Sequence, residues 1–463
     1  MTERGRDGGA GAPPDDPIRV FAVRTGKGAP ITDDDPAAWL LGESRSVEDD
    51  AAFFDDLCWR IVGNGVPLWR ATLHVAILHP QLLAFGCRWW RERNVTEELA
   101  VPLDIEQSPE FLGSPIRPAV LDGEALRYRL REAEGESFAL FRRLREEGAS
   151  DYLCLPLFRA ADRHPIVTWT TDAPEGFSDE QVGRLRALTP ALAAVVETRA
   201  VRRAAATLLD TYLGRVAGPR ILAGQIRRGQ GERLQAVILA ADLRGFTEFS
   251  DRLPAEAVIR LLDDYFECVT AAVQGHGGEV LKFIGDGVLS IFPVKGLGDR
   301  AAATAALDAA AEALAALDAP GRATGESGPP LRAGFGLHIG EVVYGNVGAP
   351  DRLDFTVIGP AVNLAFRLEG LTKELGRPLL ASAAFAHAAP RRLVSLGFRV
   401  MRGIEKPQEV FGLNEHEPAL PTGLVAGLTE AADWPQPRLP SRGGTNSLEV
   451  TEEDLVESEI VRV

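Results

Sequence analysis

The stretch A-D-L-R-G-F-T, residues 241–247, decides how the second half of this chain folds. It follows a largely apolar run, 234–240, so a buried strand should end at Asp242 in a tight turn. A second stretch, K-F-I-G-D-G-V at 282–288, places Asp286 in the turn between two short apolar runs. Carboxylates at the rim of a sheet are ready ligands for hard cations, and two on adjacent strands can hold a metal pair that acts on phosphate. We therefore expect a metal site at these two aspartates.

The residues around these turns predict a β-α-β-β order with further elements behind it. The expected elements are strand 234–241, a helix from Pro254, strands 279–284 and 288–292, helix 299–317, strands 332–339 and 355–358, and a helix from Pro360. Such an order suits an α+β, ferredoxin-like sheet of the polymerase-palm type.

Four stretches of this region resemble the catalytic domain of class III nucleotidyl cyclases, the adenylate and guanylate cyclases. They are A-A-D-L-R-G-F-T-E-F-S (240–250), L-K-F-I-G-D-G-V-L-S-I-F (281–292), G-L-H-I-G-E-V-V-Y-G-N-V-G (336–348) and D-F-T-V-I-G-P-A-V-N-L-A-F-R-L-E (354–369). Because all four occur in family order within 231–415, chance is a poor explanation of the match.

The resemblance implies two divalent cations, Mg²⁺ or Mn²⁺, as cofactors. Asp242 and Asp286 match the two metal-binding aspartates of the family, and the backbone carbonyl of Leu243 would be a further ligand. One cation would activate the ribose 3′-hydroxyl, and the other would neutralise charge on the triphosphate.

The resemblance also assigns the contacts to ribose and phosphates. Free backbone N–H groups at Gly245, Phe246 and Thr247 could cradle phosphates. Asn363 and Arg367 lie four residues apart, on one face of the helix after Gly359. The family pattern gives Asn363 the ribose and Arg367 the α-phosphate, where a guanidinium can spread positive charge over several oxygens.

Base choice depends on two positions. Lys282 matches the lysine that reads adenine N1 in adenylate cyclases, where guanylate cyclases carry an acidic residue. Thr356 occupies the second base-reading position, as in a Thr-type subclass of adenylate cyclases, and can accept from the adenine amino group. The triphosphate-binding lysine of the family corresponds here to Arg402, with Lys406 as an alternative.

The resemblance therefore implies an adenylate cyclase that converts ATP to 3′,5′-cyclic AMP and pyrophosphate. A guanylate cyclase, or a nucleotide-binding regulatory module without turnover, is the alternative. In this family the site lies between two catalytic domains, and this chain holds a single motif set with both halves. We expect a homodimer with composite sites at the subunit interface.

Composition limits the remaining function classes. A formal net charge of −16 argues against a general nucleic-acid binder. The N-terminus lacks an apolar signal core, and no uncharged apolar run reaches membrane-spanning length, so we expect a cytoplasmic protein without membrane insertion. The four cysteines have no metal-ligand spacing and are expected to be free thiols, which fits a reducing cytosol.

The chain divides into five expected segments. They are a disordered N-terminal segment (1–36), a GAF-like regulatory domain (37–190), a helical linker (191–230), the cyclase domain (231–415) and a disordered tail (416–463). The resemblance to GAF-like sensory domains is weak and depends on strand pattern, on position and on P-L-F…T-W-T-T-D-A-P-E-G-F-S-D-E (156–180).

Within 37–190 the pattern predicts a mixed α/β domain. Strands are expected at 71–78, 152–158 and 166–171, with a polar loop at 91–120 and a charged helical stretch at 124–147. Core packing is the favoured interpretation of Trp89 and Trp90 over a ligand pocket.

A helix should begin at the capping box formed by Ser178 and Gln181. Pro190 is expected to kink or restart it. The helix either closes the N-terminal domain or pairs with its copy in a dimer, and the sequence leaves both open.

Overall fold

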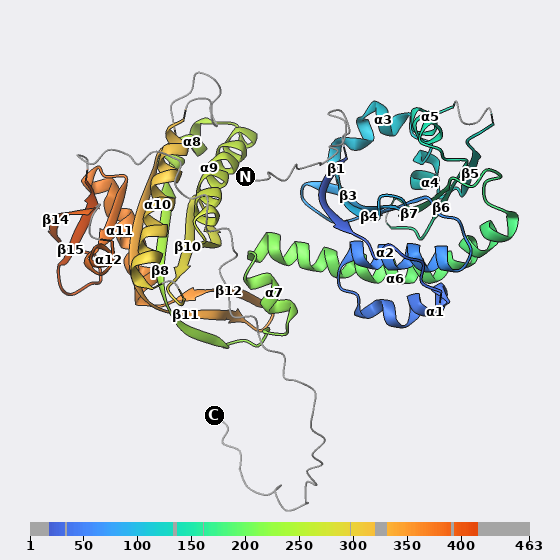
Figure 1. The fold of residues 1–463 in the computed structure, drawn as a ribbon. Coiled ribbons are helices and arrows are strands. Elements are labelled where there is room, and N and C mark those ends of the chain that lie inside the picture. Colours follow the sequence, from blue (N-terminus) through green and yellow to red (C-terminus); the bar gives the residue numbers. More distant parts are fainter. Residues whose placement is uncertain are drawn as a thin grey trace, which may run out of the picture. The chain divides into compact units, whose positions relative to one another are not determined.

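The computed structural model describes residues 18–32, 35–132, 137–160, 162–296, 298–319, 331–389 and 393–414 (Figure 1). The chain forms two compact units. The first comprises residues up to 230 together with 346–355, and the second comprises 231–345 together with 356 onward.

The first unit is built on a seven-stranded antiparallel sheet in the order β1-β4-β3-β2-β7-β6-β5. Its strands are β1 (Arg19–Thr25), β2 (Arg70–Ala76), β3 (Leu82–Trp90), β4 (Val95–Pro102), β5 (Leu126–Arg129), β6 (Asp151–Pro156) and β7 (Ile166–Thr171). Side chains alternate between the two faces of a strand. Trp89 therefore enters the core on one face and its neighbour Trp90 the core on the other, which confirms that both tryptophans are packing residues.

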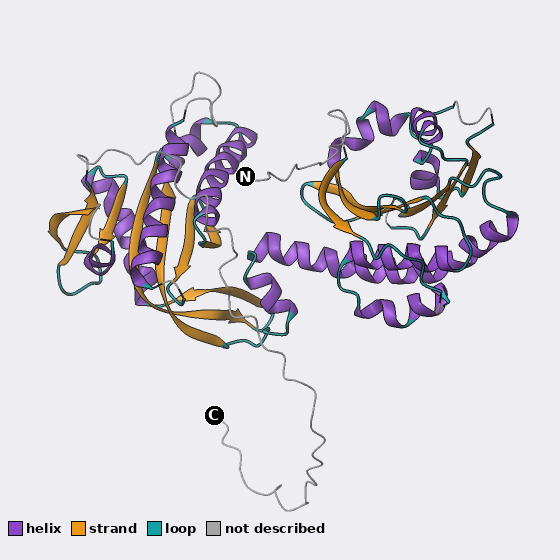
Figure 2. Ribbon diagram, viewed as in Figure 1, coloured by secondary structure: helices purple, strands orange, loops and turns teal. Residues whose placement is uncertain are grey.

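Helices cover both faces of this sheet (Figure 2). The helices of this unit are α1 (Pro36–Leu41), α2 (Asp50–Gly63), α3 (Pro109–Leu112), α4 (Arg117–Asp122), α5 (Ala139–Glu146) and α6 (Asp179–Leu213), with 3₁₀ turns η1 (Glu43–Ser46) and η2 (Leu103–Gln107). The short helix α7 (Ala217–Leu222) packs against α6 rather than on the sheet. Residues of α1, α2 and α6 build the core on one face, and residues of α4 and α5 build the core on the other.

Three expectations for this unit were wrong. Strand β1 lies inside the segment 1–36 that we expected to be disordered, although residues 1–17 lie outside the described residues. The expected polar loop 91–120 contains strand β4 and several helical turns, and the charged stretch 124–147 contains strand β5 as well as helix α5. Charged residues obscure strands β1 and β4 in the sequence. In the structure each strand is paired with a neighbour that accommodates such residues; for example, Arg88 of β3 forms an ion pair with Glu97 of β4.

The predicted capping box at the start of α6 is confirmed. The Ser178 hydroxyl accepts from the Gln181 N–H (3.2 Å), and the Ser178 N–H donates to Gln181 Oε1 (2.9 Å). Pro190 lies inside a single continuous helix, so the expected restart does not occur.

Helix α6 also crosses the domain boundary that we expected at residue 190. Its apolar residues from Val182 to Val196 pack into the core of the first unit. Beyond them, Arg199 and Arg203 both bind Asp50 of α2, at 2.7 and 2.8 Å. This part of the helix therefore closes the first unit, which is one of the two interpretations that the sequence left open.

The second unit contains the elements expected from the sequence, several of them longer. Its strands are β8 (Gly231–Leu243), β9 (Glu279–Ile284), β10 (Gly287–Pro293), β11 (Ala333–Ala349), β12 (Arg352–Ile358), β13 (Leu379–Ser382), β14 (Leu393–Arg399) and β15 (Gln408–Leu413). The end of β11 and the start of β12 fall within 346–355, the segment grouped with the first unit. Its helices are α8 (Phe246–Arg252), α9 (Ala255–Gly275), α10 (Asp299–Asp318), α11 (Pro360–Leu375) and α12 (Ala383–Ala388).

The core of the second unit confirms the ferredoxin-like prediction. In sequence, β8-α9-β9-β10-α10-β11 follows the β-α-β-β-α-β order. In space, β11, β8, β10 and β9 are successive neighbours, and all three pairs are antiparallel. Strands β13, β15 and β14 extend the sheet beyond β11.

Helices α9 and α10 share a hydrophobic core with one face of this sheet, which includes Val237, Leu239, Ala241 and Leu243 of β8. By alternation, Asp242 faces the other side.

On that other face, a row of glycines in β11 lies beneath α11. They are Gly334, Gly336 and Gly340. A Cβ atom at Gly336 would lie 2.1 Å from the Ala365 carbonyl oxygen and 2.5 Å from the Glu369 nitrogen, both in α11. A strand glycine is therefore required for the close approach of helix and sheet.

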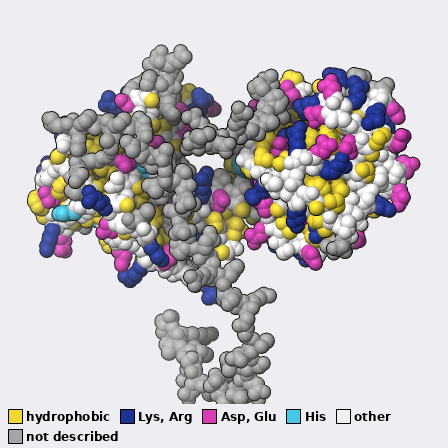
Figure 3. Space-filling model, viewed as in Figure 1, with side chains coloured by type: hydrophobic (Ala, Val, Ile, Leu, Met, Phe, Trp, Pro, Cys, Tyr) yellow, Lys and Arg dark blue, Asp and Glu magenta, His cyan; other side chains and the backbone are white. Residues whose placement is uncertain are grey.

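Other whole-chain expectations can be compared with the described residues. All four cysteines are buried and free, as predicted. Within the described ranges, no helix combines the length and apolar character needed to cross a bilayer. Acidic and basic side chains are interspersed on the visible face of each unit (Figure 3). The expected tail, 416–463, lies outside the described residues.

Candidate functional site

The structure brings Asp242 and Asp286 together at one rim of the second sheet. Asp242 is the second-last residue of β8, and Asp286 lies in the turn between β9 and β10. The β8–β10 register pairs Asp242 with Gly287, the residue that follows Asp286. Gly285 precedes Asp286 with a φ of 64°, a conformation that glycine adopts without strain. The register therefore brings the two carboxylates close enough for the charge of Asp286 to raise the pKa of Asp242.

The pair lies in an environment that opposes its own charge. Burial, and then the negative charge of Asp286, raise the pKa of Asp242 to about 6, while Arg244 acts in the opposite direction. A bound cation would relieve this repulsion, so the donor set fits a hard divalent metal.

The protein supplies only part of the ligand set that a divalent cation needs. Among the described residues, no group of three or more His, Cys, Asp or Glu side chains is placed to hold a metal ion. Mg²⁺ is commonly held by one or two carboxylates with the remaining positions filled by water and substrate phosphates. Two aspartates, with the backbone carbonyl of Leu243 at the end of β8, match that pattern.

The raised pKa leads to a stability prediction for Asp242→Asn. A carboxyl whose pKa rises on folding stabilises the protein at low pH, and this contribution is lost as the pH rises from about 4 through about 6. In EDTA at pH 7.5, the Asn variant should therefore unfold at a higher urea concentration, with about 1–2 kcal/mol more stability in the second unit.

Near pH 4 the difference should vanish, because the wild-type carboxyl is then neutral as well. Urea unfolding at both pH values, monitored by far-UV circular dichroism, tests the predicted difference in stability. A variant less stable than wild type at pH 7.5 would contradict the unfavourable charge at this position.

Sequence reasoning missed three polar residues around the pair. Glu369 of α11 is 8% exposed, and burial, then the charge of Asp242, raises the pKa of its carboxyl to about 7. Its Oε1 lies 3.6 Å from Nη1 of Arg244, an ion pair longer than a hydrogen bond. Tyr265 of α9 is fully buried, and burial, followed by the charge of Asp242, raises the pKa of its hydroxyl. The sequence signal that could have identified Glu369 is a charged residue on the helix face shared with Ala365 and Thr372, which are buried in the structure.

Asn363 and Arg367 lie on α11 as predicted. The helix begins at Pro360, with Gly359 as its N-cap, so Asn363 is in the first turn and Arg367 one turn later. A Cβ atom at Gly403 would lie 3.2 Å from Nη2 of Arg367, so the Arg367 guanidinium lies beside the turn that carries Arg402. The two arginines give this corner a concentration of positive charge suited to phosphate.

The two expected base-reading residues lie on different strands. Lys282 is half-buried on β9, and Thr356 is on β12. Thr356 is 5% exposed, and its hydroxyl has no hydrogen-bond partner in the described part of the chain. Buried hydroxyls normally have a partner, so this one has an unused donor and acceptor.

The expected phosphate-cradling segment begins helix α8. Gly245 precedes the helix in the left-handed region (φ 76°), Phe246 packs against the main core, and Thr247 is exposed. The side chain of Phe246 is therefore a packing group, and its predicted role rests on its backbone N–H alone.

Comparisons with known proteins agree with this picture of the second unit. Residues 231–376 match the family described as "Adenylate and Guanylate cyclase catalytic domain". The chain is similar to an adenylate cyclase of Anabaena cylindrica, with 35% identity over 195 residues that cover 41% of this chain and 37% of the relative.

Two solved structures are each similar to about 40% of this chain. One is a bacterial light-regulated adenylyl cyclase, 32% identical, covering 40% of this chain and 91% of that one, with a TM-score of 0.34. The other is the guanylyl cyclase Cya2, 32% identical, covering 40% of this chain and 96% of that one, with a TM-score of 0.35. The aligned segment spans about a third of the length of the first curated relatives, 37% and 32%.

Proposed function

We propose that the catalytic domain of the adenylate and guanylate cyclase family, which residues 231–376 form, converts ATP to 3′,5′-cyclic AMP and pyrophosphate in this chain. The observation that carries the proposal is the placement of Asp242 beside the turn of Asp286 at the sheet rim, where the charge of one carboxylate raises the pKa of the other. A buried carboxylate pair of this kind is suited to cations that work on phosphate. The similarity to a relative named adenylate cyclase supports the choice of ATP.

Asp242, Asp286 and the Leu243 carbonyl would hold two divalent cations, Mg²⁺ or Mn²⁺. When bound, these cations supply Lewis-acid activation of the ribose 3′-hydroxyl and charge neutralisation of the triphosphate. The pairing of Asp242 with Gly287 in the β8–β10 ladder keeps the two carboxylates at a fixed spacing. Such preorganisation avoids the cost of ordering the site at each turnover.

The side chains of α11 and of the turn after β14 provide the contacts to ribose and phosphates. Asn363 orients the ribose, and Arg367 opposes the charge that develops at the α-phosphate. Arg402 contacts the leaving pyrophosphate, since its turn lies beside Arg367.

Lys282 and Thr356 select the base. The Lys282 ammonium donates to adenine N1, and the Thr356 hydroxyl accepts from the adenine amino group. The absence of a protein partner for the Thr356 hydroxyl within the described residues supports this role, because a bound adenine would satisfy it.

Two further parts of the proposal concern assembly and regulation. The active form is a homodimer in which one chain supplies the aspartates and the other supplies Lys282, Thr356, Asn363 and Arg367. The first unit is a GAF-like regulatory domain. Its antiparallel sheet with helices on both faces, and the long helix α6 that precedes the catalytic unit in the sequence, support this assignment.

Incubation of the purified full chain with Mn²⁺ and ATP, and separately with GTP, tests the function. We expect cyclic AMP and pyrophosphate in equal amounts from ATP, and at least about tenfold less product from GTP. Asp286→Asn is the matched control, because it removes one carboxylate charge from the pair. Faster turnover of GTP would indicate a guanylate cyclase, and nucleotide binding without product would indicate a regulatory module.

A further inference from the structure

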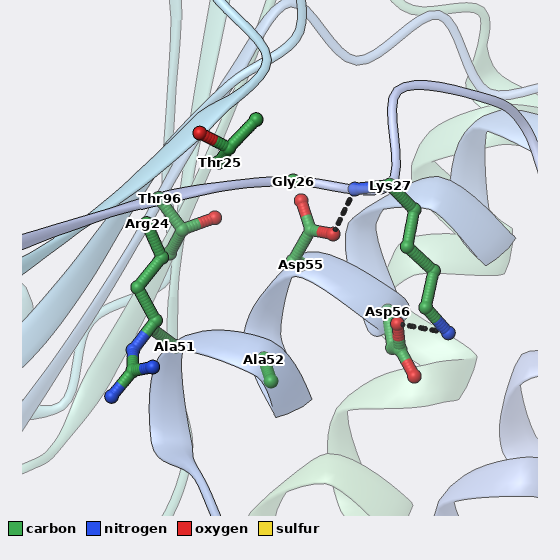
Figure 4. Close-up of a pocket in the computed structure, with 9 residues that line it drawn as sticks. All are labelled: Arg24, Thr25, Gly26, Lys27, Ala51, Ala52, Asp55, Asp56 and Thr96. Carbon is green, nitrogen blue, oxygen red and sulfur yellow. Dashed lines mark hydrogen bonds and ion pairs between the residues drawn. The ribbon is translucent and has the colours of Figure 1, made fainter.

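The first unit contains a cavity of about 260 Å³ that the proposed catalytic function does not use (Figure 4). It lies between the end of β1, the first half of α2 and strand β4. Its lining includes Asp55 of α2, Thr96 of β4, and Gly26 and Lys27, which follow β1.

Asp55 is a buried carboxylate that has no cationic partner among the residues that the structure describes. It is 4% exposed, and Trp89 Nε1 donates to its Oδ1 (3.0 Å) while the backbone N–H of Lys27 donates to its Oδ2 (2.9 Å). Both donors are neutral. None of the contacts that the described residues make to Asp55 comes from a charged ammonium or guanidinium group, so burial raises the pKa of this carboxyl.

The cations near the cavity are already engaged. Lys27 Nζ lies 2.7 Å from Asp56 Oδ1, and Figure 4 shows its chain directed away from Thr96. Arg24 contacts Asp49 at 2.6 Å and Glu98 at 3.5 Å. With the carboxylate described above, four negative groups surround two positive ones, so the region favours a cation.

Two buried oxygens beside Asp55 have unused hydrogen-bonding capacity. Thr96 is 1% exposed, and its Oγ1 has no partner among the described residues. In Figure 4 this hydroxyl points from β4 toward the Asp55 carboxylate. The Oδ1 atom of Asn94 is also buried without a partner. A Cβ atom at Gly26 would lie 2.3 Å from Asp55 Oδ1 and 2.8 Å from Asn94 Oδ1, so the two oxygens lie close together beside Gly26, although Asn94 is not among the residues that line the cavity.

We propose that this cavity binds a small ligand through a primary ammonium group. Such a group carries a positive charge and N–H donors for the Asp55 carboxylate and Thr96 Oγ1, which both line the cavity. A divalent metal is a poorer match, because no cluster of three or more His, Cys, Asp or Glu side chains placed for a metal occurs within the described ranges. The proposal concerns binding to the first unit and holds whether or not the second unit turns over ATP.

Isothermal titration calorimetry on the full chain tests the proposal with defined probes. Methylammonium, ethanolamine and 1,4-diaminobutane present a primary ammonium group, whereas tetramethylammonium carries the same charge without an N–H donor, and potassium is a bare cation. At matched ionic strength, we expect saturable binding of at least one primary amine and none of tetramethylammonium or potassium. Failure of all three amines to bind, or equal binding of tetramethylammonium or potassium, would overturn the proposal.

Two variants locate the site. Thr96→Val keeps the shape and removes one acceptor, so affinity for the bound amine should fall about fivefold. Asp55→Asn removes the charge, and affinity should fall by more than about tenfold. Glu124→Gln, an exposed charge removal in the same unit, is the control and should bind as wild type does. Thermal melting identifies a variant that does not fold, and if Asp55→Asn fails, the Thr96→Val result decides. Wild-type affinity in Thr96→Val would refute the site.

Discussion

Mixing Asp242→Ala and Arg367→Ala proteins is expected to restore about a quarter of wild-type cyclase activity, although each protein alone is inactive. Each single change should lower kcat by about a thousandfold, since each removes several kcal/mol of transition-state charge stabilisation. In a shared-site homodimer, half of the randomly mixed dimers are mixed pairs, and each mixed pair has one intact site of two.

The experiment includes a control that the chain itself offers. Asp242→Ala and Asp286→Ala both damage the metal-binding half, so mixing them leaves no intact site and should restore nothing. Activity is measured after the two proteins have exchanged subunits. Exchange is verified by giving the two proteins different labels and finding both labels in the same dimer. Verified exchange without recovery in the Asp242→Ala and Arg367→Ala mixture would place the whole site within one chain.

Lys282→Glu should reduce kcat/KM for ATP by at least about a hundredfold. The new carboxylate would face adenine N1, an acceptor, so an attractive hydrogen bond becomes a repulsive contact between two acceptors. Lys295→Glu makes the same charge change at an exposed position after β10 and is the matched control. The comparison of kcat/KM for ATP and GTP in both variants checks the prediction, and equal losses would mean that Lys282 acts through general electrostatics.

Thr356→Val separates the base-reading role of the second residue from a structural one. The Thr356 hydroxyl makes no hydrogen bond with the described residues, so its removal should leave the urea midpoint unchanged or slightly higher. The same change should lower kcat/KM for ATP about tenfold, because the adenine amino group loses its acceptor. A loss of stability of the same size as the loss of activity would indicate a structural hydroxyl.

Local patterns predicted the second unit well because its elements are strongly marked. Strand 279–284 and the start of α11 at Pro360 were predicted at the residues where the structure has them. Strand β11 continues ten residues beyond the expected end at Ile339, because its second half pairs with β8 as far as Gly231. That pairing is a contact between distant residues, which local periodicity does not record.

The first unit was harder to predict for the same physical reason. Strand β1 is short, lies in a segment rich in Gly, Pro and Asp, and exists through its pairing with β4. In β4 itself, charged residues occupy sites that ion pairs make tolerable, as Glu97 does with Arg88. The candidate site residues were predicted from motifs, whereas Glu369 was not, because its place near Asp242 depends on helix α11 facing that side of the sheet.

The glycine row of β11 has a consequence for how the second unit can vary. Asn363 and Arg367 are carried by α11, and the height of that helix above the sheet is set by the missing side chain at Gly336. The spacing between α11 and the sheet that carries Asp242 thus depends on the absence of a side chain at Gly336, and not on any of the proposed site residues. One methyl group added at Gly336 would therefore shift the helix that carries the proposed ribose and phosphate contacts.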